Sequence, residues 1–348
     1  MTKLRMAVVG VGSLGQHHAA KLSAFEDVDL VGVVDPGESQ GRTVAERVGT
    51  DWFRDVDSLP ADIHAVVVAT PTRFHLDAAT HFLTQGIPTF VEKPLASTLS
   101  DAEKLVRLAD RHNCILQVGH IERFNPAFDA ARELCGTPLY IRCQRVSPYT
   151  FRSTDIGVVH DLMIHDIDLV LDLTGQMPTS VEAFGAVGIG PHEDMAVARL
   201  KMPSGTFVDI TSSRMCPAAE RTMVIWGTEG CVEVDLQSRQ VHHWAPKGQF
   251  ASNPQLVHAL IAATSDPRTL KDRVFGEWIE VQTITASSDD AMSLELRDFI
   301  DSVRSEGSPR VSGREGVAAM QVAEQVLSSL RLWSYQTSAL AAQTKRAA

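Results

Sequence analysis

A glycine-rich run near the start of the chain has the spacing of a phosphate-binding loop. It consists of Gly10, Val11, Gly12, Ser13, Leu14 and Gly15, between a short apolar run and a helical pattern. In this context the first glycine permits a tight turn and the second lets the backbone approach a pyrophosphate. The third glycine allows the helix and strand to pack closely, and the helix N-terminus offers N–H groups to phosphates. The run therefore predicts a dinucleotide site.

An acidic residue follows at the distance that such a site requires. Asp35 ends the second predicted strand, 20 residues after Gly15. A carboxylate there binds the adenine-ribose hydroxyls of NAD and repels a 2′-phosphate. We therefore expect NAD as the cofactor rather than NADP. The alternative is a glycine turn in a protein that binds no dinucleotide.

Two further polar clusters end predicted strands. Thr70 and Pro71 follow the third strand, with His75 in the next helix, and Glu92 and Lys93 follow the fourth. Ligands of open parallel sheets bind beyond the carboxyl ends of the strands, so these residues are expected to line the cofactor site. A lysine placed there can exchange a proton with a substrate hydroxyl. The alternative for Glu92 and Lys93 is an exposed ion pair before a proline.

The third cluster lies on a strongly apolar helix predicted over residues 157–174. At 100° per residue, one polar stripe collects Asp161, His165, Asp168 and Asp172. Such a stripe on a mostly buried helix faces water or lines a cavity. No second histidine lies four residues from His165, so no metal site is predicted.

These residues must be positioned by helices and strands, and the predicted pattern of these elements changes near residue 120. Before it, continuous apolar strands alternate with helices, which indicates a parallel sheet buried on both faces. After it, strands are longer and more polar, with turn signals between them, which indicates an antiparallel sheet. Six such strands are predicted, over residues 139–146, 180–187, 196–202, 206–213, 221–226 and 231–235.

The predicted fold class is α/β, with an N-terminal Rossmann fold and a C-terminal α+β domain built on a large open antiparallel sheet. The expected domains are 1–120 and 121–335, with a frayed tail over 336–348. Residues 245–288 fit the strand pattern poorly and are expected to form an insertion. That insertion contains a short predicted helix near 255–263.

Composition excludes several classes of protein. The 348 residues include 32 basic and 43 acidic side chains, a net charge of −11, so no broad basic surface for nucleic acid is expected. No apolar run approaches the roughly 20 residues of a membrane helix, and no signal-peptide pattern is found, which predicts a cytoplasmic protein. Five irregularly spaced cysteines indicate neither a disulfide framework nor a zinc site.

Six motifs in this order resemble the glucose–fructose oxidoreductase/inositol dehydrogenase (Gfo/Idh/MocA) family of NAD(P)-dependent oxidoreductases, over nearly the whole chain. They are the glycine loop, 69–75, Glu92-Lys93-Pro94, 119–126, Asp161-x-x-x-His165-Asp166 and 311–316. The resemblance implies that Lys93 and His165 are the catalytic acid–base pair, with Asp161 assisting. It also implies oxidation of a sugar or cyclitol hydroxyl to a ketone, and a homodimer or homotetramer formed through the C-terminal sheet.

Within the family, residues 119–126 and 160–172 most resemble the enzymes that oxidise UDP-N-acetylglucosamine at C3 for lipid A or surface glycans. By that resemblance, Asp161, His165, Arg123 and Asn125 lie near a UDP-sugar. Its diphosphate would be paired by one of three arginines, which are otherwise solvated surface residues: Arg142, Arg145 and Arg152.

Two alternatives stay open. One is a dehydrogenase of a free sugar or inositol. The other, of a different class, is a non-catalytic NAD-sensing or partner-binding protein. The joint presence of Lys93, Asp161 and His165 argues against the second.

Overall fold

A computed structural model describes the chain except residues 1, 152–155, 249–252, 254, 265 and 348, and it omits the side chains of 257, 267 and 332–347. The chain forms two compact units. The first comprises residues up to Phe124 together with Asp289–Glu324, and the second comprises Asn125–Ser288 together with the residues after Glu324.

The first unit is a Rossmann fold. Its elements are β1 (Leu4–Val9), α1 (Gly15–Ala24), β2 (Val28–Val34), α2 (Glu38–Val48), β3 (Trp52–Phe53), η1 (Val56–Ser58), β4 (Ala65–Val68), η2 (Thr72–Phe74), α3 (His75–Leu83), β5 (Thr89–Glu92), α4 (Leu99–Arg111), β6 (Leu116–Gly119), η3 (Ile121–Phe124) and α10 (Ala291–Ser305). The strand order is β3-β2-β1-β4-β5-β6, with every pair parallel. This is the order of a dinucleotide-binding doubly wound sheet, and it confirms the predicted fold class.

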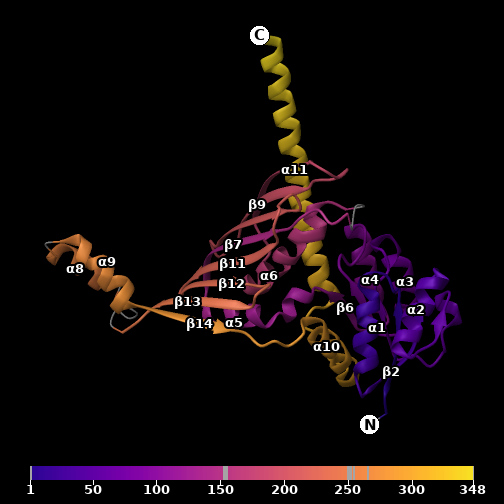
Figure 1. The fold of residues 1–348 in the computed structure, drawn as a ribbon. Coiled ribbons are helices and arrows are strands. Elements are labelled where there is room, and N and C mark those ends of the chain that lie inside the picture. The colour runs from indigo at the N-terminus through magenta and orange to yellow at the C-terminus, as the bar shows by residue number, and fades with distance from the viewer. Residues whose placement is uncertain (1, 152–155, 249–252, 254, 265, 348) are drawn as a thin grey trace. The chain divides into compact units, whose positions relative to one another are not determined.

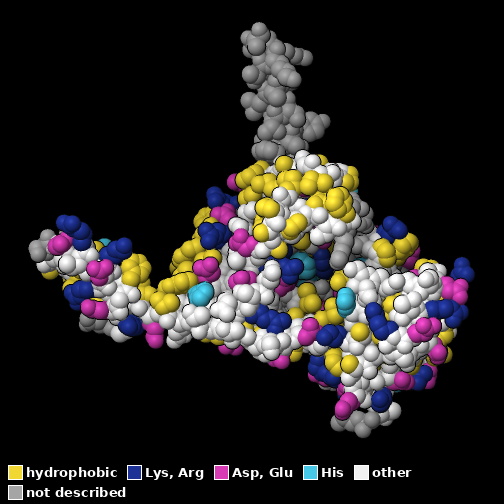
Figure 2. Space-filling view, in the orientation of Figure 1, with side chains coloured by type: hydrophobic (Ala, Val, Ile, Leu, Met, Phe, Trp, Pro, Cys, Tyr) yellow, Lys and Arg dark blue, Asp and Glu magenta, His cyan; other side chains and the backbone are white. Residues whose placement is uncertain are grey.

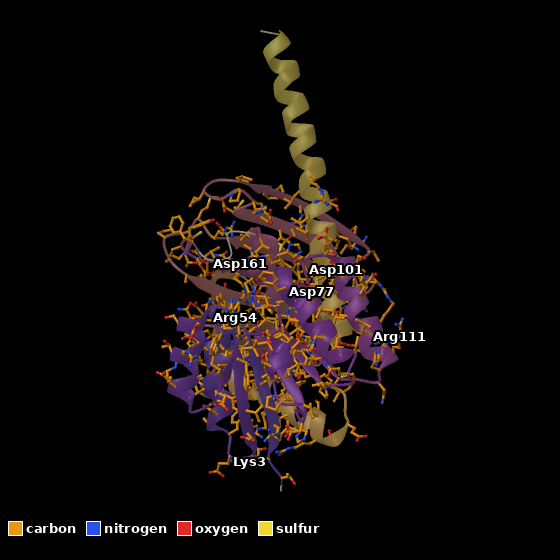
Figure 3. All side chains as sticks on the ribbon, turned by 90° about the vertical axis from the view of Figure 1, so that its right-hand side faces the viewer. Lys3, Arg54, Asp77, Asp101, Arg111 and Asp161 are labelled. Atoms are coloured by element: carbon orange, nitrogen blue, oxygen red, sulfur yellow. The ribbon has the colours of Figure 1, made fainter. Side chains whose placement is uncertain are left out.

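The parallel arrangement sets the direction of the sheet. Lys3 directly precedes β1 and marks the amino edge, whereas Arg54 directly follows β3 and marks the carboxyl edge (Figure 3). Asp101 and Arg111 lie near the two ends of α4 in the same view. The glycine loop, Asp35, Thr70 and Lys93 all follow strands, so they lie at the carboxyl edge.

Helix α10 belongs to this unit, although the sequence-based division placed residues 121–335 in the second domain. Its buried side chains Leu296, Phe299 and Ile300 complete the apolar core around Met6 and Phe90. Arg297 forms an ion pair with Asp27 at 2.7 Å. A late segment of the chain therefore returns to the first unit because its apolar stripe fills that core.

Two local details complete this unit. The short strand β3 carries no apolar run long enough to be recognised from the sequence. The N-cap of α4 is Thr98, whose side chain accepts a hydrogen bond from the Asp101 N–H.

The second unit is built on an eight-stranded open sheet. Its elements are α5 (Pro126–Leu134), β7 (Pro138–Val146), η4 (Val159–Met163), α6 (Ile164–Thr174), β8 (Ser180–Ala186), β9 (Met195–Lys201), β10 (Phe207–Ser213), β11 (Glu220–Gly227), β12 (Gly230–Asp235), β13 (Gln240–Pro246), α8 (Gln255–Ala263), α9 (Pro267–Arg273), η5 (Val274–Trp278) and β14 (Ile279–Thr285). The order is β14-β13-β12-β11-β7-β10-β9-β8. All pairs are antiparallel except β7 and β10, so the sheet is mixed rather than wholly antiparallel.

One face of this sheet is covered by helices. Helix α5 contacts β12 and β13, and α6 contacts β7 and β10. The opposite face leaves large apolar side chains exposed, among them Phe184, Phe207 and Trp226. Figure 2 shows apolar side chains along the left flank of the sheet.

The predicted insertion is a helical excursion between two paired strands. Helix α8 has the predicted bounds, and β13 and β14 pair with each other on either side of the excursion. In Figure 1, α8 and α9 lie beyond the ends of these strands. Neither strand was predicted, although the alternating pattern of 279–285 is a strand signal.

The last helix, α11 (Gly313–Ala347), begins in the first unit and continues into the second. It extends past residue 335, where the frayed tail was expected, because residues 336–347 contain no glycine or proline to end it. Within the described part of the chain, no helix combines the length and apolar character needed to cross a membrane.

Candidate functional site

The glycine loop has the geometry expected of a dinucleotide-binding turn. Gly10 has φ +85°, and a Cβ there would lie 2.8 Å from the backbone of Thr70. A Cβ on Gly15 would lie 1.8 Å from the carbonyl oxygen of Gly10. Gly12 has no such neighbour within 4 Å, so the space beside its Cα is open. The first and third glycines are therefore required for packing, whereas the second leaves room for a ligand, and the loop fits a pyrophosphate.

Asp35 lies beside this loop. Its Oδ2 accepts a hydrogen bond from the Val11 N–H at 3.0 Å, and its Oδ1 accepts one from the Gly37 N–H at 2.9 Å. Trp52 on β3 donates its indole N–H to the Asp35 carbonyl oxygen at 3.0 Å. The carboxylate is thus fixed by the loop that would bind the pyrophosphate, at the position predicted for ribose recognition.

His75 occupies a buried position rather than an open one. Its ring nitrogens contact the carbonyl oxygens of Thr70 at 2.8 Å and Pro94 at 2.9 Å. Burial lowers the pKa of His75, although both carbonyl contacts and the charge of Glu92 act in the opposite direction. His75 therefore lies between the loops after β4 and β5, and its contact with the cofactor stays a prediction.

Glu92 and Lys93 do not form the exposed ion pair considered as an alternative. Glu92 is 7% exposed, and its Oε1 lies 2.6 Å from Nε2 of the fully buried His18 on α1. Lys93 is half-buried and is followed by the cis-proline Pro94. Sequence reasoning missed His18, whose only signal was a histidine three residues after the last glycine of the loop.

In the second unit, the predicted catalytic helix begins with an irregular turn. Residues Val159–Met163 form the π-helical turn η4, and α6 follows from Ile164. Asp161, labelled in Figure 3, lies in η4, and His165 lies at the start of α6. Both side chains are half-buried. The sequence predicted one regular helix here, and π-turns of this kind are common at functional sites.

A buried ion pair anchors the start of α6. Arg145 on β7 binds Asp166 through Nε and Nη2, at distances of 2.9–3.2 Å. Both side chains are almost completely buried. This guanidinium is paired with a carboxylate of the protein, and its contact with a diphosphate stays a prediction. Its position fixes the residue next to His165.

A second buried pair holds the approach to η4. Asp194 accepts N–H bonds from Gly188, Ile189 and Gly190 at 2.5–2.9 Å, and Arg214 donates to its other oxygen at 2.8 Å. Burial raises the pKa of Asp194, but these hydrogen bonds outweigh burial and hold it well below the usual range.

Arg214 also donates to the carbonyl oxygen of Ile156 at 3.1 Å, three residues before η4. Sequence reasoning missed this pair because it joins two loops that carry no motif.

The other predicted substrate residues fall in different places. Arg123 is buried in the first unit. Asn125 is the N-cap of α5, accepting from the Ala127 N–H and donating to the Leu236 carbonyl. Arg142 lies on β7 three residues before Arg145, so the two project from opposite faces of the sheet. Arg152 lies outside the described residues.

Among the described residues there is no group of three or more His, Cys, Asp or Glu side chains that could hold a metal ion. All five cysteines are free.

Fold and glycine loop together define an oxidoreductase with an NAD-binding Rossmann unit. Residues 4–120 match the profile of the oxidoreductase family with an NAD-binding Rossmann fold, and residues 130–233 match the GFO/IDH/MocA C-terminal domain. The chain belongs to the Gfo/Idh/MocA family, as its motifs predicted.

Individual relatives agree with this assignment. The chain is 35% identical to the UDP-N-acetylglucosamine 3-dehydrogenase of Acidithiobacillus ferrooxidans over 243 residues, covering 70% of this chain and 77% of the relative. A crystal form of that protein superposes with a TM-score of 0.83 over 95% of this chain and 98% of the other. The scyllo-inositol 2-dehydrogenase (NAD(+)) of Bacillus subtilis is 32% identical, covering 68% of this chain and 75% of the relative.

Proposed function

We propose that the protein is an NAD-dependent dehydrogenase that oxidises UDP-N-acetylglucosamine to its 3-keto sugar. The observation that carries this proposal is the similarity to the UDP-N-acetylglucosamine 3-dehydrogenase of Acidithiobacillus ferrooxidans, which spans both units. The structure supports it with a glycine loop shaped for a pyrophosphate and with acid–base side chains in both units.

Oxidation of a secondary alcohol removes a hydride from carbon and a proton from oxygen. NAD, when bound, supplies the hydride acceptor. The glycine loop would hold the pyrophosphate of NAD, and Asp35 would hold its adenine ribose. Lys93 and His165 form the proposed acid–base pair that takes the hydroxyl proton, and Asp161 assists them. Thr70 and Pro71, at the end of β4, border the same loop.

The preference for NAD over NADP rests on Asp35. A 2′-phosphate at the ribose would approach a carboxylate that already accepts two backbone hydrogen bonds. Like charges in contact raise the free energy of the complex, so NADP binding is disfavoured.

The exposed face of the second unit's sheet supports a homodimer or homotetramer. Phe184, Phe207 and Trp226 leave this face partly apolar, and apolar patches of this kind mark association surfaces. We place the protein in the cytoplasm, because free cysteines are typical of a reducing compartment.

The decisive experiment incubates the protein with NAD and a panel of UDP-sugars, free sugars and inositols, and follows NADH absorbance. We expect the largest kcat/KM with UDP-N-acetylglucosamine, and inhibition by UDP. A faster reaction with an inositol would favour the second candidate, which the 32% identity to the scyllo-inositol enzyme supports. NAD binding with no turnover on any substrate would favour the non-catalytic alternative.

A further inference from the structure

Two histidines lie fully buried on either side of the Lys93–Pro94 turn. His18 on α1 is 0% exposed and His75, at the start of α3, is 1% exposed. Burying a polar ring costs free energy unless it is hydrogen-bonded, so a histidine at such a site is there for its contacts. His18 contacts Glu92, directly before the turn, and His75 contacts the carbonyl oxygen of Pro94 within it.

The contact from His18 passes through Glu92. One carboxylate oxygen, Oε1, lies 2.6 Å from His18 Nε2, a short hydrogen-bond distance. The other oxygen, Oε2, accepts the backbone N–H of Lys93 at 3.2 Å. Both oxygens are therefore engaged, and one of them fixes the backbone of Lys93 itself.

The neighbouring strand leaves room for this carboxylate and for little else. Gly119 on β6 pairs with Glu92 on β5. A Cβ on Gly119 would lie 2.9 Å from Glu92 Oε2, closer than real Cβ atoms approach. The glycine therefore allows the carboxylate to fold back onto Lys93, where a larger residue would displace it.

The contact from His75 reaches the other side of the turn. Its Nδ1 lies 2.9 Å from the carbonyl oxygen of Pro94, directly after Lys93, and its Nε2 lies 2.8 Å from that of Thr70 in the loop after β4. A Cβ on Gly10 would touch Thr70, so this loop also packs against the glycine loop.

Electrostatics keep the buried carboxylate ionised. Burial raises the pKa of Glu92, but the hydrogen bond from His18 and the charges of His18 and Lys93 outweigh it, and the net pKa is lowered. One buried negative charge thus acts on the lysine turn and, through space, on His75.

We propose that His18, Glu92 and His75 are positioning residues that lock the Lys93–Pro94 turn to the two nucleotide-binding loops. Lys93 is thereby aimed before substrate arrives. This inference rests on the proposed role of Lys93 in proton transfer, and goes beyond it by naming the side chains that hold the lysine in place.

The test uses Glu92→Gln, His18→Gln and the double variant. We expect kcat to fall about 10- to 100-fold in each single variant, the range observed when a supporting partner of a functional group is lost. KM for NAD should change less than about threefold, and the double variant should be no slower than the slower single variant, because the pair acts as a unit. Asp27→Asn is the control. It removes the ion pairs with Arg297 and Arg304 in the same unit and should keep kcat within about twofold.

A second readout does not need catalysis. Trace acetylation followed by peptide mass spectrometry reports the reactivity of each lysine, with the ion-paired Lys21 and Lys104 as internal references. In Glu92→Gln we expect Lys93 to react severalfold faster, because the carboxylate that favours its charged form and fixes its turn is lost. If Glu92→Gln does not fold, His18→Gln is measured in the same way.

Unchanged Lys93 reactivity together with a kcat within twofold of wild type would overturn the positioning role. A rate loss no larger than that of Asp27→Asn would overturn it as well. If Lys93→Met keeps full turnover, the role of Lys93 in proton transfer fails, while a changed Lys93 reactivity in Glu92→Gln still supports the positioning role. The proposed function itself fails only if the wild-type protein turns over none of the substrates in the panel.

Discussion

The two units hold their candidate catalytic residues in different ways. In the first unit, Lys93 follows the parallel strand β5, and the sheet itself carries it to the carboxyl edge, which also holds the glycine loop. In the second unit, Asp161 and His165 lie on a helix whose first turn is irregular, next to two buried Arg–Asp pairs. A parallel sheet places a site by topology, whereas a helix lying on a mixed sheet needs specific buried partners to fix its start.

The largest expected effect comes from the proposed acid–base pair. Lys93→Met should lower kcat by about 10³-fold or more, and His165→Asn by about 10²-fold, because general acid–base groups contribute roughly 10²- to 10⁴-fold. Titration of NAD by fluorescence should show that Lys93→Met still binds the cofactor. If Lys93→Met or His165→Asn turned over at the wild-type rate, the substituted residue would have no part in the proposed proton transfer.

The next largest expected effect is a loss of stability in the second unit, which a control variant compares with the first unit. Asp194→Asn should lower the free energy of unfolding by about 3–5 kcal/mol, because it leaves the buried Arg214 without its charge partner. The folded-state pKa of Asp194 is depressed, so its stabilisation is present above the unfolded pKa of about 4 and is lost as pH falls through the folded value. The difference between variant and wild type in denaturant melts should therefore narrow below about pH 4.

The matched control in the first unit is Asp27→Asn, which removes two partly exposed ion pairs, with Arg297 and Arg304, each worth at most about 1 kcal/mol. If Asp194→Asn and Asp27→Asn lowered the free energy of unfolding equally at pH 7, the buried pair of the second unit would be no more important for stability than the partly exposed pairs of the first.

The smallest effect concerns cofactor choice. Asp35→Ala should weaken NAD binding about tenfold and reduce the discrimination against NADP, because the ribose hydroxyls lose an acceptor and a 2′-phosphate loses its repulsion. Kd values for both cofactors measure this directly. Asp29→Ala, on the same strand but near its amino end, should change neither Kd. An unaltered NAD-to-NADP ratio in Asp35→Ala would show that another group sets the preference.

Much of the first unit was predictable because its signals are local. The glycine spacing, the acid at the end of β2 and the apolar strands each depend on a few consecutive residues. The sequence carries no signal for contacts between residues that are distant along the chain. The pairing of Arg145 with Asp166 and the contacts of His75 with the carbonyl oxygens of Thr70 and Pro94 are seen only in the structure.

The secondary-structure elements that the sequence did not predict correctly were missed for the same reason, because they depend on contacts with distant parts of the chain. Strands β13 and β14 are recognised by their pairing across a helical excursion, and α10 joins the first unit only because its apolar stripe fits that core. The π-turn η4 has no sequence signal that distinguishes it from a regular helix.

The sequence by itself determined the family, the parallel and the largely antiparallel regions, and the candidate residues Lys93, Asp161 and His165, since motif spacing and hydrophobic periodicity are properties of neighbouring residues. Only the tertiary structure decided which charges are buried and with whom they pair. Burial and pairing depend on contacts between residues as distant as His18 and Glu92, where low dielectric makes each partner essential to the other.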